Sequence, residues 1–197
     1  MPVEEISYDA CEYGRGMIVV TGMPGAGKDE FVKVARSLGF IDLHMGNTVR
    51  EFAKNAGIPE IDHEIGNFAT SERKKYGMDI WAVRTAQKIT DDGRTVIDGL
   101  RNYEELQYFS KFSENPYVVA IFASRKDRFS RILKRDRPDD IRTMEELIER
   151  DTRELSWGIG NVIALADYMI VNDDTLETFH ARCRKLLTEK FSISNKI

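Results

Sequence analysis

A glycine-rich segment near the start of the chain has the residue types needed to bind phosphate. Gly22, Gly27 and Lys28 have the GxxxxGK spacing of a Walker A loop, after a β-branched run and before an amphipathic helical pattern. Glycines let successive backbone N–H groups point at phosphate oxygens, the helix dipole adds to them, and the lysine bridges the β- and γ-phosphates. The alternative is a Gly-Pro turn before a helix that begins with lysine. The residues predicted to bind ATP are Gly22, Met23, Pro24, Gly25, Ala26, Gly27, Lys28, Asp29 and Glu30.

Two carboxylates are candidate ligands for the Mg²⁺ that accompanies ATP. Asp29 follows Lys28, at the position where a Ser or Thr hydroxyl normally helps to hold the ion, and Asp98 ends the buried run 95–98. Ligands gather at the carboxyl ends of parallel strands, so Asp98 should lie beside the phosphate loop. Carboxylates bind Mg²⁺ directly or through water. A helix-start role for Asp29, which would also repel a triphosphate, and a turn-capping role for Asp98 are the alternatives.

A basic segment interrupts the otherwise acidic chain from residue 125 to residue 137. Arg128, Arg131 and Arg135 fall on one helical face, ahead of a break at Arg137-Pro-Asp-Asp and a second helix with more arginines at positions 150 and 153. Two helices joined by an arginine-rich turn suit a lid, at about residues 128–140, that closes over phosphates. The alternative is a solvated helical face. The predicted catalytic cations are Lys28, Arg131, Arg135 and Arg137.

The elements that position these residues alternate along the chain. Predicted strands cover residues 17–21, 41–43, 95–98, 117–122 and 168–171, with helical patterns between them. This alternation predicts right-handed βαβ units and a parallel sheet with helices on both faces. Helix starts are marked by Asp79, by Asn102 with Glu105 before a helix over 103–112, and by Thr143 with Glu146.

Composition excludes several classes of protein. The chain has 197 residues, 42% of them hydrophobic and 31% charged, which is typical of a globular fold and not of a disordered chain. Its net charge of −4 argues against duplex nucleic acid as a partner. The longest apolar run, 117–123, is too short to cross a membrane, and residues 1–15 have no signal-peptide pattern. Cys11 and Cys183 have no metal-ligand spacing. We predict a cytoplasmic protein with a tail (1–15) and one domain (16–197).

The motifs resemble those of adenylate-kinase-related P-loop nucleotide kinases. The loop that ends at Lys28 resembles the adenylate kinase loop, and Met45-Gly-Asn-Thr-Val-Arg50 resembles that family's acceptor motif. Val96-Ile-Asp-Gly-Leu-Arg101 is similar to the strand that ends in DGFPR, with its arginine displaced by one residue. The ending 166–172 resembles dephospho-CoA kinase. From about residue 17 to residue 173, the chain resembles an archaeal group of such proteins of uncertain substrate.

The resemblance implies an α/β P-loop NTPase fold of the nucleoside-monophosphate-kinase type. The sheet would have five parallel strands in the order 2-3-1-4-5, with an acceptor segment at about residues 46–76 and a short lid. ATP would be the donor, with Mg²⁺ as cofactor, and adenine would be the base of the acceptor. The acceptor-binding residues implied are Gly46, Arg50, Arg73 and Arg101.

The nature of the acceptor depends on whether the site holds a general base. A hydroxyl acceptor, as in dephospho-CoA kinase, needs such a base, whereas a phosphate acceptor is already anionic and needs none. Residues 44–47 contain no carboxylate, and His44 is the one candidate base among them, although a lone histidine beside a strand is more often a packing or hydrogen-bonding residue. The missing carboxylate and the presence of Arg50 together favour a nucleoside monophosphate as the acceptor, with AMP as the first candidate. The alternatives are a hydroxyl kinase of the dephospho-CoA type, a non-catalytic ATP- or AMP-binding regulatory protein, and a nucleotide hydrolase.

Overall fold

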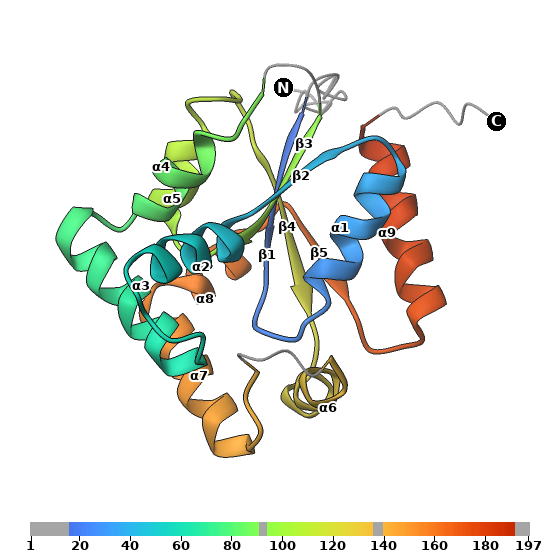
Figure 1. Ribbon diagram of the computed structural model, residues 1–197. Coiled ribbons are helices and arrows are strands. Elements are labelled where there is room, and N and C mark those ends of the chain that lie inside the picture. Colours follow the sequence, from blue (N-terminus) through green and yellow to red (C-terminus); the bar gives the residue numbers. More distant parts are fainter. Residues whose placement is uncertain (1–15, 91–93, 136–139, 192–197) are drawn as a thin grey trace, which may run out of the picture.

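A central parallel sheet organises the part of the chain that the computed structural model describes, residues 16–90, 94–135 and 140–191. Its five strands lie in the order β2-β3-β1-β4-β5, with helices on both faces (Figure 1). This confirms the predicted α/β class and strand order. The strands are β1 (Met17–Thr21), β2 (Ile41–His44), β3 (Thr95–Leu100), β4 (Tyr117–Phe122) and β5 (Tyr168–Val171).

Helices connect successive strands and follow the last one. They are α1 (Lys28–Ser37), α2 (Met45–Asn55), α3 (Asp62–Tyr76), α4 (Ile80–Ala86), α5 (Tyr103–Phe109), α6 (Arg125–Arg135), α7 (Met144–Ser156), α8 (Ile159–Ala164) and α9 (Leu176–Lys190). Helices α1 and α9 cover one face of the sheet, and α2, α4, α5 and α8 cover the other (Figure 1). Helix α6 lies beyond the carboxyl end of β4, from which it follows after two residues.

The middle strand, β1, is buried on both sides. Ile18 and Val20 point into the core beneath α1 and α9, whereas Met17 and Val19 point into the core on the opposite face. A strand alternates its side chains between faces, so an uninterrupted apolar run is needed to fill both cores. The phosphate loop therefore begins at the end of a rigid, fully buried strand.

Several predicted boundaries and caps are confirmed and others are corrected. Asn102 and Thr143 cap α5 and α7 through their side chains, and Thr143 forms a full capping box with Glu146. Asp79 precedes α4, but its side chain makes no capping hydrogen bond. Strand β3 continues two residues past Asp98, and α5 ends at Phe109, three residues before the predicted end.

The predicted acceptor segment contains α2 and α3. The stretch from residue 61 to residue 78 has weak periodicity in the sequence, yet most of it forms the 15-residue helix α3. The buried residues of α3 are Gly66, Ala69 and Arg73, which are two small residues and one charged residue. The buried side of the helix therefore lacks the large apolar side chains on which a periodic pattern in the sequence depends. The sequence pattern does not reveal this helix, because the burial of Arg73 depends on its partner Glu105, which lies further along the chain.

The remaining sequence predictions concern membrane spans, the cysteines, and the tail and lid segments. Across the described ranges, every helix is too short or too polar to cross a lipid bilayer. Cys183 is a free thiol on the buried side of α9, and burial raises its pKa to about 12. The predicted tail at residues 1–15, which contains Cys11, lies outside the described residues, as do residues 136–139 of the predicted lid.

Candidate functional site

The phosphate loop is a tight turn between β1 and α1, and three of its positions leave no room for a side chain. Gly22, Gly25 and Gly27 all have positive φ angles. A Cβ atom on Gly22 would lie 2.3 Å from the carbonyl oxygen of Ile121, and one on Gly27 would lie 2.3 Å from the amide nitrogen of Asn172. The loop is thus pressed against the ends of β4 and β5, and the N-terminus of α1 follows it.

Side chains from later in the sequence hold the outside of this loop. Asn172 donates from Nδ2 to the carbonyl of Ala26 (2.8 Å), and Arg128 donates from Nη1 to the carbonyl of Pro24 (3.1 Å). Arg131 donates from Nη2 to the carbonyl of Asn172 (2.9 Å). Because the loop carbonyls of Pro24 and Ala26 accept hydrogen bonds from side chains outside the loop, the protein itself supports the loop conformation.

Lys28 begins α1 and lies inside the loop. Its side chain is buried, and Nζ donates to the carbonyl oxygens of Gly22 (2.7 Å) and Met23 (3.3 Å). Burial, with the Arg101 charge nearby, lowers its pKa to about 8 against the attraction of Asp98. The ammonium group is therefore poorly solvated, which favours an anionic ligand beside it.

The lid prediction placed Arg128 on a cationic face, and this is corrected. Arg128 is only 4% exposed and forms a two-pronged ion pair with Asp151 of α7, at 2.9 and 2.7 Å. Together with its bond to Pro24, this pair connects α6, α7 and the phosphate loop. Arg128 is a structural support of the loop.

We expect Arg128→Met to lower the free energy of unfolding by about 3–5 kcal/mol, because it leaves the Asp151 carboxylate buried without its main partner. Arg125→Met is the matched control, since Arg125 contacts the same carboxylate at 3.3 Å but is 55% exposed. Its expected cost is about 1 kcal/mol or less. Urea unfolding measures both values, and equal losses would contradict the assignment of Arg128 as the buried support.

The other predicted lid arginines lie beside the loop or outside the described residues. Arg131 reaches Asn172, as above, and Arg135 makes a two-pronged ion pair with the buried carboxylate of Asp140, at 2.9 and 2.5 Å. Arg137 falls within residues 136–139, outside the described ranges. The arginines of α6 at positions 125, 128, 131 and 135 are thus all held by protein groups.

Two cavities open on either side of the phosphate loop. One, of about 520 Å³, lies toward β5 and α9 and is lined by Gly27, Arg131 and Asn172 among others. The second, of about 450 Å³, lies toward β2 and β3 and is lined by His44, Arg50 and Asp98 among others. Four residues line both: Gly25, Lys28, Asp29 and Arg135. The cavities therefore meet at the lysine and at the end of α6.

All four predicted acceptor residues line the second cavity or the smaller pocket that continues it inward. Gly46 and Arg50 come from α2, and Arg101 follows β3; all three line both spaces. Arg73 of α3 lines the inner pocket only. It is 4% exposed, donates from Nη2 to Glu105 (2.8 Å), and lies over the ring of Trp157, 4.4 Å from its centroid.

Two further arginines of the inner pocket, Arg150 and Arg153, come from α7, where the sequence suggested a lid. Both form ion pairs with Asp62 at the start of α3. A Cβ on Gly66 would lie 2.3 Å from the Arg153 side chain, so only glycine leaves room for it. The signal in the sequence is the i, i+3 spacing of these arginines, which places them on one face of the helix.

The inner pocket has more positive than negative charge. Five arginines and two carboxylates line it, and Glu105 behind it pairs with Arg73. Buried guanidinium N–H groups of Arg73, Arg150 and Arg153 have no hydrogen-bond partner in the described structure. Burial, with nearby Arg135 and Arg153, lowers the pKa of Arg150 below its ordinary value despite Asp62 and Glu154. These groups are suited to bind an anion.

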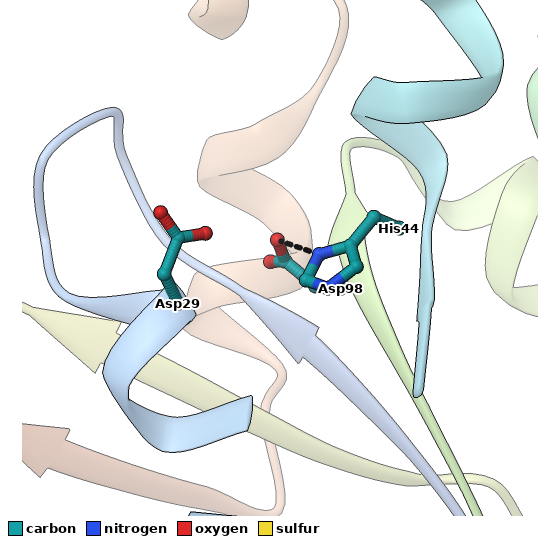
Figure 2. A group of neighbouring side chains, drawn as sticks. All are labelled: Asp29, His44 and Asp98. Atoms are coloured by element: carbon teal, nitrogen blue, oxygen red, sulfur yellow. Dashed lines mark hydrogen bonds and ion pairs between the residues drawn. The ribbon is translucent and has the colours of Figure 1, made fainter. Parts of the chain in front are cut away.

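The predicted metal ligands, Asp29 and Asp98, do lie together, and His44 joins them (Figure 2). One ligand atom from each lies within 4.8 Å of the others. Burial alone would raise the pKa of the Asp98 carboxyl, but His44, Lys28 and Arg101 together hold it below the ordinary value. From the sequence, His44 is interpreted as a base or as a packing or hydrogen-bonding residue; its place beside the two aspartates depends on strand pairing and is not visible in the sequence.

The loop between the central strand and its following helix, in a sheet of this order, defines a P-loop kinase-like protein. The chain belongs to the UPF0200 family, and its residues 21–148 match the family model described as an AAA domain. A UPF0200 protein of Thermoplasma volcanium is 77% identical over 177 residues, which are 90% of this chain and 99% of that relative. One from Hyperthermus butylicus is 43% identical over 88% of this chain and 94% of its own.

Solved structures share the fold at low sequence identity. Shikimate kinase from Bacteroides thetaiotaomicron superposes with a TM-score of 0.59 at 17% identity, over 87% of this chain and 98% of that one. The protein TT1252 from Thermus thermophilus superposes with a TM-score of 0.60 at 16% identity, over 89% of this chain and 98% of that one. The predicted relation to P-loop nucleotide kinases of uncertain substrate is thus confirmed at the level of family and fold.

Proposed function

We propose that this protein is an ATP-dependent phosphotransferase whose acceptor is a nucleoside monophosphate, with AMP as the first candidate and Mg²⁺ as the ion bound with ATP. The observation that carries the proposal is the pair of cavities that meet at Lys28 and Arg135. A donor and an acceptor that share one reacting phosphoryl group need two such spaces with a common boundary. A purely regulatory nucleotide-binding protein needs one.

The donor is assigned to the cavity beside β5 and α9. Its phosphates would lie on the loop, where the N-terminus of α1 and Lys28 favour negative charge. Asp29 and Asp98 would hold the metal, directly or through water, at the boundary with the acceptor cavity. The ion supplies charge neutralisation to the transferred group, and Arg131 and Arg135 would add to it.

The acceptor is assigned to the cavity with the arginine cluster. Its phosphate would bind the cluster of Arg50, Arg73, Arg101, Arg150 and Arg153, where a dianion would offset the excess positive charge. An anionic phosphate oxygen attacks without loss of a proton, so the site needs positioning and charge neutralisation and no general base. This favours a phosphate acceptor over the neutral hydroxyl of a dephospho-CoA-type substrate.

A coupled assay with ATP, Mg²⁺ and a panel of nucleoside monophosphates tests the proposal. We expect phosphate transfer to at least one monophosphate, AMP tested first, and little ADP formation without an acceptor. Dephospho-CoA in the same assay reports the hydroxyl-kinase alternative. ADP formation at the same rate with and without every acceptor would instead indicate a hydrolase and contradict the proposal.

Removal of Arg50 or Arg101 should weaken binding of the monophosphate by about ten- to a hundredfold and leave ATP binding unchanged, because charge-assisted phosphate contacts are worth about 1.5–3 kcal/mol each. Since Arg101 also pairs with the buried Glu154, Arg101→Ala is tested together with Glu154→Gln. Arg184→Ala, an exposed arginine on α9, is the control. Calorimetry that gives equal losses for both nucleotides would contradict separate donor and acceptor sites.

A further inference from the structure

The sequence predicts two aspartates, Asp29 and Asp98, as metal ligands, and the structure places a histidine, His44, beside them. Strands β2 and β3 pair in parallel with His44 opposite Asp98, so the two side chains lie side by side at the same edge of the sheet. His44 Nδ1 is 3.3 Å from Asp98 Oδ2 (Figure 2). Asp29 approaches from the first turn of α1. Three chain segments thus converge beside the acceptor cavity.

Asp98 has an oxygen available for a ligand. The residue is 9% exposed, and its Oδ1 is buried and accepts no hydrogen bond from any described residue. A buried carboxylate oxygen in this state is costly unless a cation or a donor group occupies the space beside it. The Asp98 residue, together with Asp29 and His44, lines the cavity of about 450 Å³.

A second carboxylate orients the histidine from behind. His44 Nε2 lies 3.1 Å from Oδ2 of Asp42, which is two residues earlier on β2 and therefore on the same face of the strand. Arg36 holds that carboxylate with two hydrogen bonds, of 2.9 and 2.7 Å. In the structure Nδ1 forms a hydrogen bond with Oδ2 of Asp98. A cation in the place of that bond would take the lone pair of Nδ1, with the hydrogen on Nε2 donated to Asp42. Metal-binding histidines are normally held in this way by a carboxylate behind the ring.

We infer that Asp29, His44 and Asp98 form a preassembled site for a divalent transition-metal ion, with Asp42 as the carboxylate that positions His44. Mg²⁺ takes oxygen ligands almost exclusively, whereas Mn²⁺ and the later ions of the first transition row accept imidazole nitrogen as well. The histidine therefore shifts the preference of the site away from Mg²⁺. The three protein ligands lie together without a nucleotide, so the site can bind the ion in the absence of ATP.

This inference rests on the proposed function for the place of the metal and replaces Mg²⁺ there with a transition-metal ion, and it is tested without nucleotide or acceptor. The titration uses Mn²⁺ with the full chain and follows free Mn²⁺ by electron paramagnetic resonance. We expect one Mn²⁺ to bind at least tenfold more tightly than Mg²⁺ does in competition. His44→Gln should weaken Mn²⁺ binding at least tenfold and change Mg²⁺ binding less than about threefold. Asp42→Asn should weaken Mn²⁺ binding by about ten- to a hundredfold.

A spectroscopic measurement on the unmodified protein removes any dependence on whether the variants fold. Pulsed resonance of the Mn²⁺ complex should show coupling to an imidazole ¹⁴N nucleus, and His63→Gln, which replaces an exposed histidine, should retain it. Absence of nitrogen coupling, or unchanged Mn²⁺ affinity in a folded His44→Gln variant, would overturn the inference. A protein that binds Mn²⁺ through His44 but transfers no phosphate would refute the proposed function alone.

Discussion

Replacement of Lys28 by methionine is expected to abolish the stabilisation that ATP gives the protein. At an ATP concentration about 100 times Kd, a ligand that binds only the folded state adds about 2.7 kcal/mol, which corresponds to an increase of roughly 5–10 °C in the unfolding midpoint for a chain of this size. Lys28 lies inside the loop with Nζ on the carbonyl of Gly22, and methionine keeps most of the length of the side chain but has no charge. Thermal unfolding with and without ATP measures the effect.

The fold should tolerate this change. The variant loses the hydrogen bond to Gly22 but also the cost of burying an ammonium group, so its midpoint without ATP should lie close to that of the wild type. Lys185→Met, an exposed lysine on α9, serves as the control and should keep the full response to ATP. If Lys28→Met binds ATP with wild-type affinity, the phosphate-loop assignment is wrong.

The same variant isolates the pH dependence that Lys28 contributes. Its pKa is about 8 in the folded protein, below its ordinary value of 10.5, so between these pH values the unfolded chain holds more protons than the folded one. Stability then rises with pH through this interval. The free energy of unfolding of the wild type should therefore increase relative to that of Lys28→Met between about pH 8 and pH 10, as urea titrations at several pH values will show.

The features that the sequence predicts well are local ones. The parallel sheet follows from the alternation of short β-branched runs with helical patterns, and the phosphate loop follows from glycine spacing between a strand and a helix. The capping of α5 and α7 depends on residues three positions apart. Each of these signals is contained within a few neighbouring residues, so no knowledge of the tertiary structure is needed.

The features that it predicts poorly depend on partners far away in the chain. Arg128 looks like one more solvated cation until Asp151, 23 residues later, is known to neutralise it. His44 looks isolated because Asp98, 54 residues away, reaches it only through strand pairing. A periodic pattern of apolar residues marks a buried helix face in the sequence, and a face that is buried through ion pairs lacks this pattern. The charged interior between α3 and α7 is therefore the part least visible in the sequence.

Arg135→Ala is expected to lower kcat by about a hundredfold or more, with a much smaller increase in KM for ATP. Arg135 lines both cavities, so its guanidinium lies where the transferred phosphoryl group would pass. In the structure it is paired with Asp140. Negative charge shifts toward the transferred group and the leaving oxygen during the reaction, so a cation placed there stabilises the transition state more than the bound substrate.

Three further variants separate catalysis from stability. Arg135→Lys should recover only part of the lost kcat, because an ammonium group cannot form the planar two-pronged contact. Asp140→Asn breaks the same ion pair but keeps the arginine, so it should lower the unfolding midpoint and leave most of kcat intact. Lys126→Ala, an exposed lysine on α6, should change neither. A kcat that follows stability across this series, or stays at the wild-type value in Arg135→Ala, would show that Arg135 only fastens α6 to Asp140.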